Sequence, residues 1–214
     1  MPRDASDTRL RLIAAAQTLF AQRGVHQATT REILAAAGQR NVSALTYHFG
    51  SREQLLLAIL ERHNVGLELG RVTRLVEPAE AMPTRDLVCA LVVPFASCLD
   101  TADGRDYLRI VAQLTDLFPL WRTPPVSAPH LNRVLEILER RAGEMAAVRR
   151  QRVVAMMMLM TTACAERARA VDEGAVVELD PDVFVSGLAD MIVALLEAPV
   201  GPLVAHDAAG GLAP

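Results

Sequence analysis

The chain has 214 residues, of which 51% are hydrophobic and 4% aromatic, and its formal net charge is −3. This apolar fraction is enough for a sizeable core and excludes wholesale disorder, and the predominance of Ala, Leu, Val and Met favours helices over strands. The two longest uncharged stretches, 87–99 and 153–165, have 13 residues each, which is too short to span a bilayer core of about 30 Å. We therefore expect no membrane partner.

The first predicted helix covers about residues 6–23, where apolar side chains recur at helical spacing, and Gly24 ends it. A second short helix follows, capped by Thr29 or Thr30 and ended by Gly38. These signals are local and of well-known meaning, so the sequence predicts two helices joined by a tight turn.

A third short helix is expected over about 42–48, and Ser51 caps a fourth that extends to about Val76. Helical patterns resume after a proline-marked linker, at 84–101 (kinked at Pro94), 104–117, 130–142, 147–172 and 181–197. The prediction is an all-α chain of about nine helices. We divide it into a three-helix DNA-binding domain (1–52), a C-terminal helical domain for effector binding and dimerisation (53–198) and a flexible tail (199–214).

Charge is distributed unevenly along the chain. All 22 basic residues are Arg, and residues 1–52 hold seven of them against three acidic residues, for a charge of +4, whereas the remainder carries −7. A basic head on an acidic body is typical of a separate nucleic-acid-binding module. Ordinary variation in surface charge is the alternative explanation.

Residues 29–52 have the layout of a helix-turn-helix, because two short helices flank a turn that contains glycine. Val42, Leu45 and Phe49 are spaced to hold the third helix against the first two. Small and polar side chains then face outward, where they can approach base edges in the major groove. These outward positions are Ser43, Ala44, Thr46 and Tyr47.

Arg40 and Asn41 stand at the entry to the third helix and are the candidate readers of guanine and adenine, respectively. Hydroxyl, N–H and guanidinium groups at helix N-termini are suited to phosphate. As single residues, the threonines and Ser51 are equally ordinary helix caps, so the prediction depends on their combination at the basic end of the chain. The candidate DNA contacts are Thr29, Thr30, Arg40, Asn41, Ser43, Ala44, Thr46, Tyr47, His48, Ser51 and Arg52.

The segment 10–57 resembles the DNA-binding head of the TetR family of bacterial regulators. The matching motifs are A-A-x-x-L-F-A-x-x-G at 15–24, T-T-x-x-I at 29–33, A-A-G at 36–38, Y-H-F at 47–49 and S-x-E-x-L-L at 51–56. The resemblance implies a homodimer that binds a pseudo-palindromic DNA operator as a repressor and leaves it when a small-molecule effector binds the C-terminal domain. It also implies DNA contacts at Thr30, Ser43, Ala44, Thr46, Tyr47, His48 and Arg52.

Three features depart from the family pattern. The turn 39–41 is one residue longer than the commonest form, which leaves the alignment of Arg40 and Asn41 open. Thr46 stands where many members carry an aromatic residue, and Arg52 where Lys is more frequent. Arg keeps the charge of a phosphate contact but not its geometry.

The last two predicted helices are apolar along one side, and the same patch from two chains would form a four-helix bundle. A symmetric operator needs two heads about 34–36 Å apart, which favours dimerisation over the alternative that these stripes are core of a single chain. The interface candidates are Val154, Met157, Met158, Thr161, Phe184, Leu188, Met191, Ile192 and Leu195.

The resemblance also implies a ligand pocket between the middle helices. Met adapts to irregular apolar ligands, and few charges interrupt these segments, so we expect a lipophilic or acyl-like effector. Plain core packing is the alternative for the same residues. The pocket candidates are His63, Phe95, Cys98, Tyr107, Phe118, Trp121, Met156 and Met160.

Two other functions were weighed. A thiol-redox or metal-responsive regulator would use Cys89, Cys98 and Cys164, helped by His63, but these residues show neither a CxxC pair nor metal-ligand spacing. An enzyme is not expected, since no nucleophile, phosphate-loop or zinc motif is present. The sequence therefore predicts no cofactor or metal, with the thiols reduced and the chain in the cytoplasm.

Overall fold

A computed structural model describes residues 2–41, 43–120 and 126–200. Within these ranges the chain is all-helical, with nine α-helices and no strand, which confirms the predicted fold class and number of helices. Their bounds are α1 Pro2–Arg23, α2 Thr30–Ala36, α3 Ala44–Phe49, α4 Arg52–Val72, α5 Thr84–Ala96, α6 Ala102–Val111, α7 Pro129–Arg141, α8 Ala146–Asp172 and α9 Pro181–Glu197. None of the helices described is long and apolar enough to cross a membrane.

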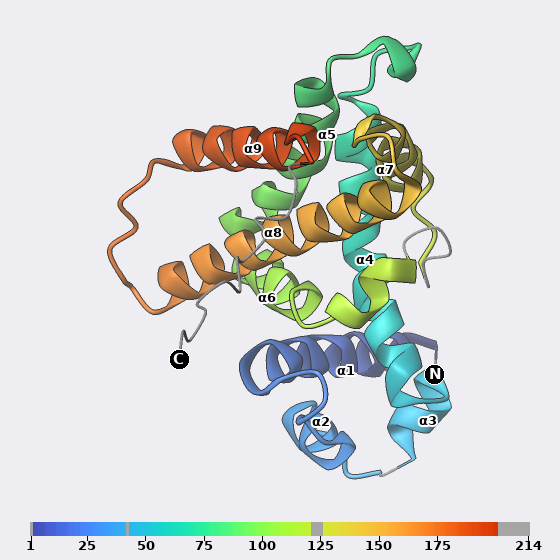
Figure 1. Ribbon diagram of the computed structural model, residues 1–214. Helices are drawn as coiled ribbons and strands as arrows, with labels where there is room; N and C mark the ends of the chain where they lie inside the picture. Colours follow the sequence, from blue (N-terminus) through green and yellow to red (C-terminus); the bar gives the residue numbers. More distant parts are fainter. Residues whose placement is uncertain (1, 42, 121–125, 201–214) are drawn as a thin grey trace, which may run out of the picture.

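The first three helices form a small head at one end of the molecule (Figure 1). Gly24 ends α1 and Gly50 separates α3 from α4, with φ of 106° and 77°, a region that glycine enters without steric cost. The fully buried Leu12, Phe20 and Ile33 are at the centre of the head, where α1 packs against α2 and α4. The glycines predicted to end helices therefore lie where the chain turns within the head.

Helix α4 runs from the head into a larger body made of α5 to α9 (Figure 1). The body has its own core, which includes the fully buried Leu87, Leu135 and Met156. Helices α4 and α5 approach closely at Gly70. A Cβ added to this glycine would lie 2.8 Å from Cβ of Pro94, which is closer than real Cβ contacts. The proline expected to kink the chain thus lies inside α5, at the contact with α4.

The fourth helix ends at Val72 rather than near residue 76, and the helix predicted over 104–117 is divided. It ends at Val111, and a 3-10 turn covers Thr115–Leu120. The reason lies at Gln113, whose side-chain amide Nε2 donates to the carbonyl of Arg109 at 2.9 Å while its backbone N–H bonds the carbonyl of Ile110 at 3.0 Å. The backbone N–H thus bonds one residue nearer than in an α-helix, and the side-chain amide occupies the Arg109 carbonyl at the point where α6 ends.

The core of the head extends beyond residue 52, which was the predicted domain boundary. It includes Leu55 and Ile59 of α4, as well as Ile110 and Leu114 from the body side. Head and body therefore share a packed junction, and the boundary at 52 falls at the start of a continuous helix. The division into domains stays a prediction.

Candidate DNA-binding interface and ligand pocket

A capping box begins α2. The hydroxyl of Thr29 accepts from the backbone N–H of Glu32 at 3.3 Å, and the backbone N–H of Thr29 donates to a Glu32 carboxylate oxygen at 2.9 Å. Hydrogen bonds from Thr29, with a smaller contribution from Arg23, lower the pKa of Glu32. A carboxylate is therefore already at this helix N-terminus and competes with phosphate, which leaves the exposed Thr30 as the better candidate contact.

The turn before α3 is shaped by Asn41. Its side-chain oxygen Oδ1 accepts from the backbone N–H of Ser43 at 2.9 Å, and its backbone carbonyl accepts from the N–H of Ala44 at 3.1 Å. Reading adenine needs the oxygen and the nitrogen of an amide together. Asn41 would have to give up its bond to the N–H of Ser43 in order to read adenine. In the free head this side chain therefore stabilises the turn before α3.

Helix α3 presents only part of its predicted outward face. Ala44 is 8% exposed and packs with Leu45 into the core of the head, so the prediction that it faces outward is wrong. Ala44 and Leu45 both face the core at the start of α3, so little of the Ala44 side chain is accessible to DNA. Ser43, Thr46 and Tyr47 are exposed, as predicted, while Val42 lies outside the described residues.

Arg52 is half-buried and already has partners. Its Nε and Nη2 donate to the carbonyl of Ala28 at 3.2 and 3.1 Å, and its guanidinium lies over the ring of Phe20, 4.8 Å from the centroid. The side chain therefore ties the start of α4 to the residues before α2. Ser51 caps α4 by accepting from the N–H of Gln54 at 3.2 Å, as expected from the sequence.

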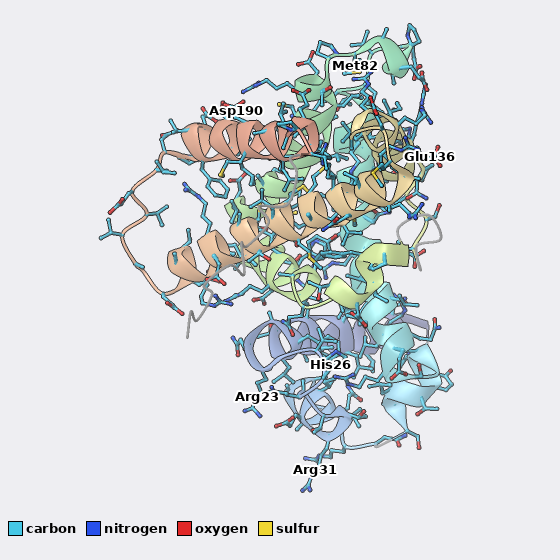
Figure 2. All side chains as sticks on the ribbon, in the orientation of Figure 1. Arg23, His26, Arg31, Met82, Glu136 and Asp190 are labelled. Carbon is cyan, nitrogen blue, oxygen red and sulfur yellow. The ribbon has the colours of Figure 1, made fainter. Side chains whose placement is uncertain are left out.

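The exposed cations of the helix-turn-helix are Arg31 and Arg40. Figure 2 shows Arg31 at the outer end of the head, pointing away from the body. Arg31 is not among the predicted DNA contacts, although it follows Thr30 directly in the first turn of α2. His48 is half-buried and makes an edge contact with the ring of Tyr47, with centroids 5.0 Å apart.

Residues 12–59, which cover most of the head and the start of α4, match the sequence model of the bacterial regulatory proteins of the tetR family. The match identifies the head as a TetR-type DNA-binding segment. The head is also 60% identical over 47 residues to the HTH-type transcriptional dual regulator CecR of Shigella flexneri, a match that covers 22% of this chain and 20% of that protein. The chain thus aligns with only a fifth of the length of that relative.

Two solved structures share the fold of nearly the whole chain. NalD of Pseudomonas aeruginosa has a TM-score of 0.55 at 20% identity, covering 89% of this chain and 96% of that one. A tetR-family regulatory protein from Rhodococcus RHA1 has a TM-score of 0.52 at 17% identity, covering 88% and 96%. Because the identities are low, these matches establish the arrangement of helices and nothing finer.

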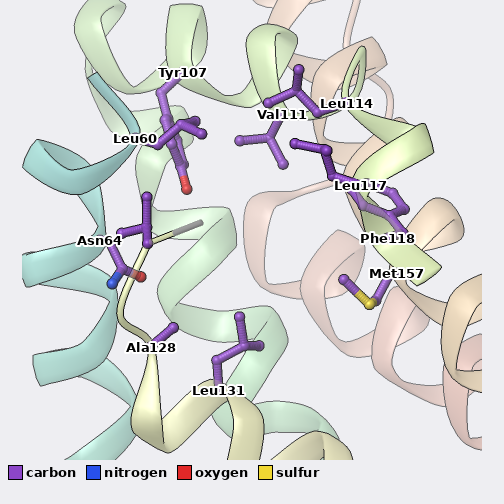
Figure 3. A pocket seen from close by; sticks show the side chains of 11 residues that line it. Leu60, Asn64, Tyr107, Val111, Leu114, Leu117, Phe118, Ala128, Leu131 and Met157 are labelled. Atoms are coloured by element: carbon purple, nitrogen blue, oxygen red, sulfur yellow. The ribbon is translucent and has the colours of Figure 1, made fainter. Parts of the chain in front are cut away.

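The body contains an apolar cavity of about 150 Å³ between α4, α6, α7 and α8 (Figure 3). Of the predicted pocket residues, Tyr107 and Phe118 line it. Its polar groups are the Tyr107 hydroxyl and the side chain of Asn64, which donates to the carbonyl of Ser127 at 2.6 Å. The residues that sequence analysis missed are Leu60, Asn64, Val111, Leu114, Leu117, Val126, Ala128, Leu131 and Met157.

The other predicted pocket residues do not line this cavity. His63 stacks on the ring of Tyr107 at 4.3 Å, behind the cavity wall. Met157, rather than either predicted methionine, faces the space, because neighbouring positions on α8 point in directions about 100° apart. Phe95, Met156 and Met160 are buried in the body core, with the half-buried Cys98 packed against it, and Trp121 lies outside the described residues.

Helix α6 touches both the cavity and the head. Its backbone and carboxylate at Asp103 accept from Nε2 of Gln17, at 2.7 and 3.0 Å. Gln17 is 1% exposed, and its Oε1 lies 3.2 Å from Nε2 of His63. Beyond the end of α6, Oε1 of Gln113 accepts from the backbone N–H of Val25 at 2.7 Å. A polar network therefore joins α1 to the helix that carries Tyr107.

The predicted dimer interface divides into buried and outward residues. Thr161, Leu188 and Ile192 are buried inside the single chain, so the alternative of intramolecular core is correct for them. Met158 and Met191 are 39% and 53% exposed and remain available to a partner. The half-buried members are Val154, Met157, Phe184 and Leu195.

The cysteines give the thiol-redox alternative no support. Burial raises the pKa of Cys98 to about 11 and that of Cys164 to about 12, which disfavours the reactive thiolate. Burial raises the pKa of Cys89 as well, against a smaller opposite effect of Arg85. Among the described residues no group of three or more metal-ligating side chains is assembled.

Proposed function

We propose that the chain is a ligand-responsive repressor, a DNA-binding transcriptional regulator that leaves its operator when a small apolar effector fills the cavity. The observation that supports this most strongly is the position of α6, which lines the cavity with Tyr107 and Val111 and bonds the head through Asp103. A ligand that displaces these two wall residues moves the same helix that holds α1. An operator-binding regulator acts on the chromosome, so we expect a cytoplasmic protein without enzymatic activity.

On the DNA side, α3 enters the major groove with Ser43, Thr46 and Tyr47, which are exposed on the free head. Arg31 lies at the outer end of the head and is suited to phosphate, while Arg40 at the entry to α3 is suited to a base edge. The two arginines should therefore differ in what their loss does to binding.

Fluorescence anisotropy with a duplex from the promoter upstream of this coding sequence and a scrambled duplex tests this. Arg31→Ala should weaken binding to both duplexes and reduce the salt slope by about one. Arg40→Ala should weaken binding mainly to the promoter duplex. Arg150→Ala, at an exposed site on α8, is the matched control. Equal affinity of the unsubstituted protein for both duplexes at moderate salt would overturn the proposal.

Two heads must be held at the spacing of successive major grooves, about 34–36 Å. We propose a homodimer in which the outward sides of α8 and α9, with Met158 and Met191, meet their symmetry copies. Met191→Glu should shift the protein from dimer to monomer in light scattering at micromolar concentration. A chain that is already monomeric without substitution contradicts this part of the proposal.

The cavity supports a small lipophilic effector. Apolar cavities of about 150 Å³ in proteins hold molecules of roughly the size of benzene, and Val111, Leu117 and Leu131 give this one a largely apolar wall. One structural relative, a TetR variant from Acinetobacter baumannii AYE, was crystallised with minocycline, which supports a small-molecule ligand for a protein of this fold. Apolar compounds that stabilise the protein to heat should also release it from the promoter duplex.

A further inference from the structure

The hydroxyl of Tyr107, on α6, is a buried polar group without a hydrogen-bond partner among the described residues. The residue is 6% exposed, and its ring contacts two others, with centroids 4.3 Å from His63 in a stacked arrangement and 6.2 Å from Phe95 edge-on. Tyrosine hydroxyls in protein interiors usually find a partner. The two ring contacts therefore fix the direction of a hydroxyl whose own hydrogen bond is missing.

This hydroxyl faces the apolar cavity. Tyr107 lines the cavity directly, and Figure 3 shows its hydroxyl oxygen at the end of the ring that points into the space. Burial raises the pKa of Tyr107, so the hydroxyl keeps its proton at neutral pH and can donate it to an acceptor. The other polar side chain on the described wall is Asn64, which already donates to the carbonyl of Ser127 at 2.6 Å. Of these two side chains, Tyr107 is the one left unbonded.

The rest of the wall limits the chemistry of a ligand. No described residue that lines the cavity is charged, and all except Tyr107 and Asn64 are apolar. A charged group moved from water into such a space without a partner is strongly disfavoured. A pure hydrocarbon matches the wall but leaves the Tyr107 hydroxyl unsatisfied, which costs free energy in a buried site. The cavity is therefore complementary to an apolar molecule with one uncharged oxygen.

We propose that the effector is an uncharged apolar molecule of about the size of benzene that carries one acceptor oxygen, as a phenol, an alcohol or a ketone does. The oxygen accepts a hydrogen bond from the Tyr107 hydroxyl, and the apolar part contacts Val111, Leu117 and Phe118. The inference rests on the proposed ligand-binding function and names the chemical class of the ligand. A water molecule bonded to Tyr107 is the competing explanation, and it predicts that a ligand oxygen gains nothing from this hydroxyl.

Titration calorimetry with the full chain tests this with ligands of matched size. Phenol is paired with toluene and benzyl alcohol with ethylbenzene, so that a hydroxyl replaces a methyl group within each pair, and benzoate is the charged ligand. Without a partner for the oxygen, the hydrocarbon of each pair should bind about tenfold or more tightly, because the hydroxyl loses its hydrogen bonds to water.

We expect instead that the hydroxyl compound of at least one pair binds at least as tightly as its hydrocarbon, and that benzoate binds more weakly than phenol. Tighter binding of the hydrocarbon in both pairs overturns the inference. So does benzoate binding more tightly than phenol, or a lack of binding by all of these ligands.

Tyr107→Phe removes the hydroxyl and keeps the ring. The ratio of phenol affinity to toluene affinity should fall about threefold to tenfold, the value of one hydrogen bond, while toluene binds at least as tightly as before. Thr161→Val is the matched control, because it removes a buried hydroxyl of α8 that does not line the cavity, and it should keep the ratio. A ratio unchanged in Tyr107→Phe shows that the ligand does not use this hydroxyl and refutes the inference.

Leu117→Trp shows where the ligands bind. The larger side chain fills part of the cavity, so it should weaken the binding of phenol and toluene alike, by about tenfold or more. Unchanged affinities in this variant place the ligands elsewhere and contradict the assignment to the cavity.

Binding to the promoter duplex, measured in parallel, separates this inference from the proposed function. If toluene binds more tightly than phenol and both release the duplex, the chain is ligand-responsive but the oxygen assignment is wrong. If the unsubstituted protein does not bind the duplex at all, the proposed function fails irrespective of which ligands the cavity takes.

Discussion

Replacing Gln113 by Ala should cut the main hydrogen-bonded link between the end of α6 and the head. The Gln113 side chain accepts from the N–H of Val25 at 2.7 Å and donates to the carbonyls of Phe20 and Arg109 at 3.2 and 2.9 Å. The Phe20 carbonyl also accepts from the N–H of Gly24 at 3.1 Å, so it stays bonded after the substitution. The N–H of Val25, a residue that is 2% exposed, does not.

The expected loss follows from these partners. An unsatisfied buried N–H costs about 1–3 kcal/mol, and the two donated bonds contribute about 0.5–1.5 kcal/mol each. We therefore expect Gln113→Ala to lower the free energy of unfolding by about 4 kcal/mol, which corresponds to a fall in Tm of roughly 8–16 °C for a chain of this size. Gln113→Glu keeps an acceptor for Val25 but loses the donor, so its loss should be smaller.

Urea denaturation followed by circular dichroism measures this difference. All variants must be compared at one protein concentration, because self-association adds a concentration-dependent stability. Gln151→Ala, at an exposed position on α8, is the matched control and should change the free energy of unfolding by less than about 0.5 kcal/mol. If Gln113→Ala is no less stable than this control, the junction between head and body does not depend on the contacts described.

Three further predictions test other contacts. Arg52→Ala should lower both DNA affinity and stability, the latter by about 1–2 kcal/mol, because Arg52 is bonded to the Ala28 carbonyl; unchanged stability would show that this bond is unimportant. Gly104→Ala should cost about 3 kcal/mol in urea denaturation, because its Cβ would lie 2.2 Å from the Cys98 carbonyl oxygen, whereas Gly66→Ala, with open space around it, should be neutral or stabilising; equal effects would refute the close approach. Burial lowers the pKa of His63 against the opposing charge of Asp103, so the unfolded chain binds the proton more readily. Stability from this histidine is full above about pH 6.5 and falls as the pH drops below it, and His63→Gln should flatten that part of a urea-midpoint profile between pH 7.5 and 5.5.

Local signals account for most of what was predicted correctly. Thr29 and Ser51 cap α2 and α4, and Gly24 and Gly50 end the helices before them, because each signal acts on backbone groups within four residues. The predicted helix over 104–117 was wrong about its end, because α6 stops at Val111 at a long-range contact and not at a local signal. This end depends on the Gln113 side chain, which is held by the carbonyl of Phe20, 93 residues earlier in the chain.

The amino-acid sequence by itself determined the all-α fold, the helix-turn-helix and the basic head, since these follow from periodicity, capping and charge along the chain. Only the tertiary structure decided which way side chains face: Ala44 inward, Met157 rather than Met156 into the cavity, and Leu188 into the core of its own chain. It also brought Glu68 of α4 to the start of α7, where its carboxylate accepts from the backbone N–H groups of His130 and Leu131. Helical periodicity gives the angles between side chains on one helix, but the direction of the whole set depends on where neighbouring helices pack.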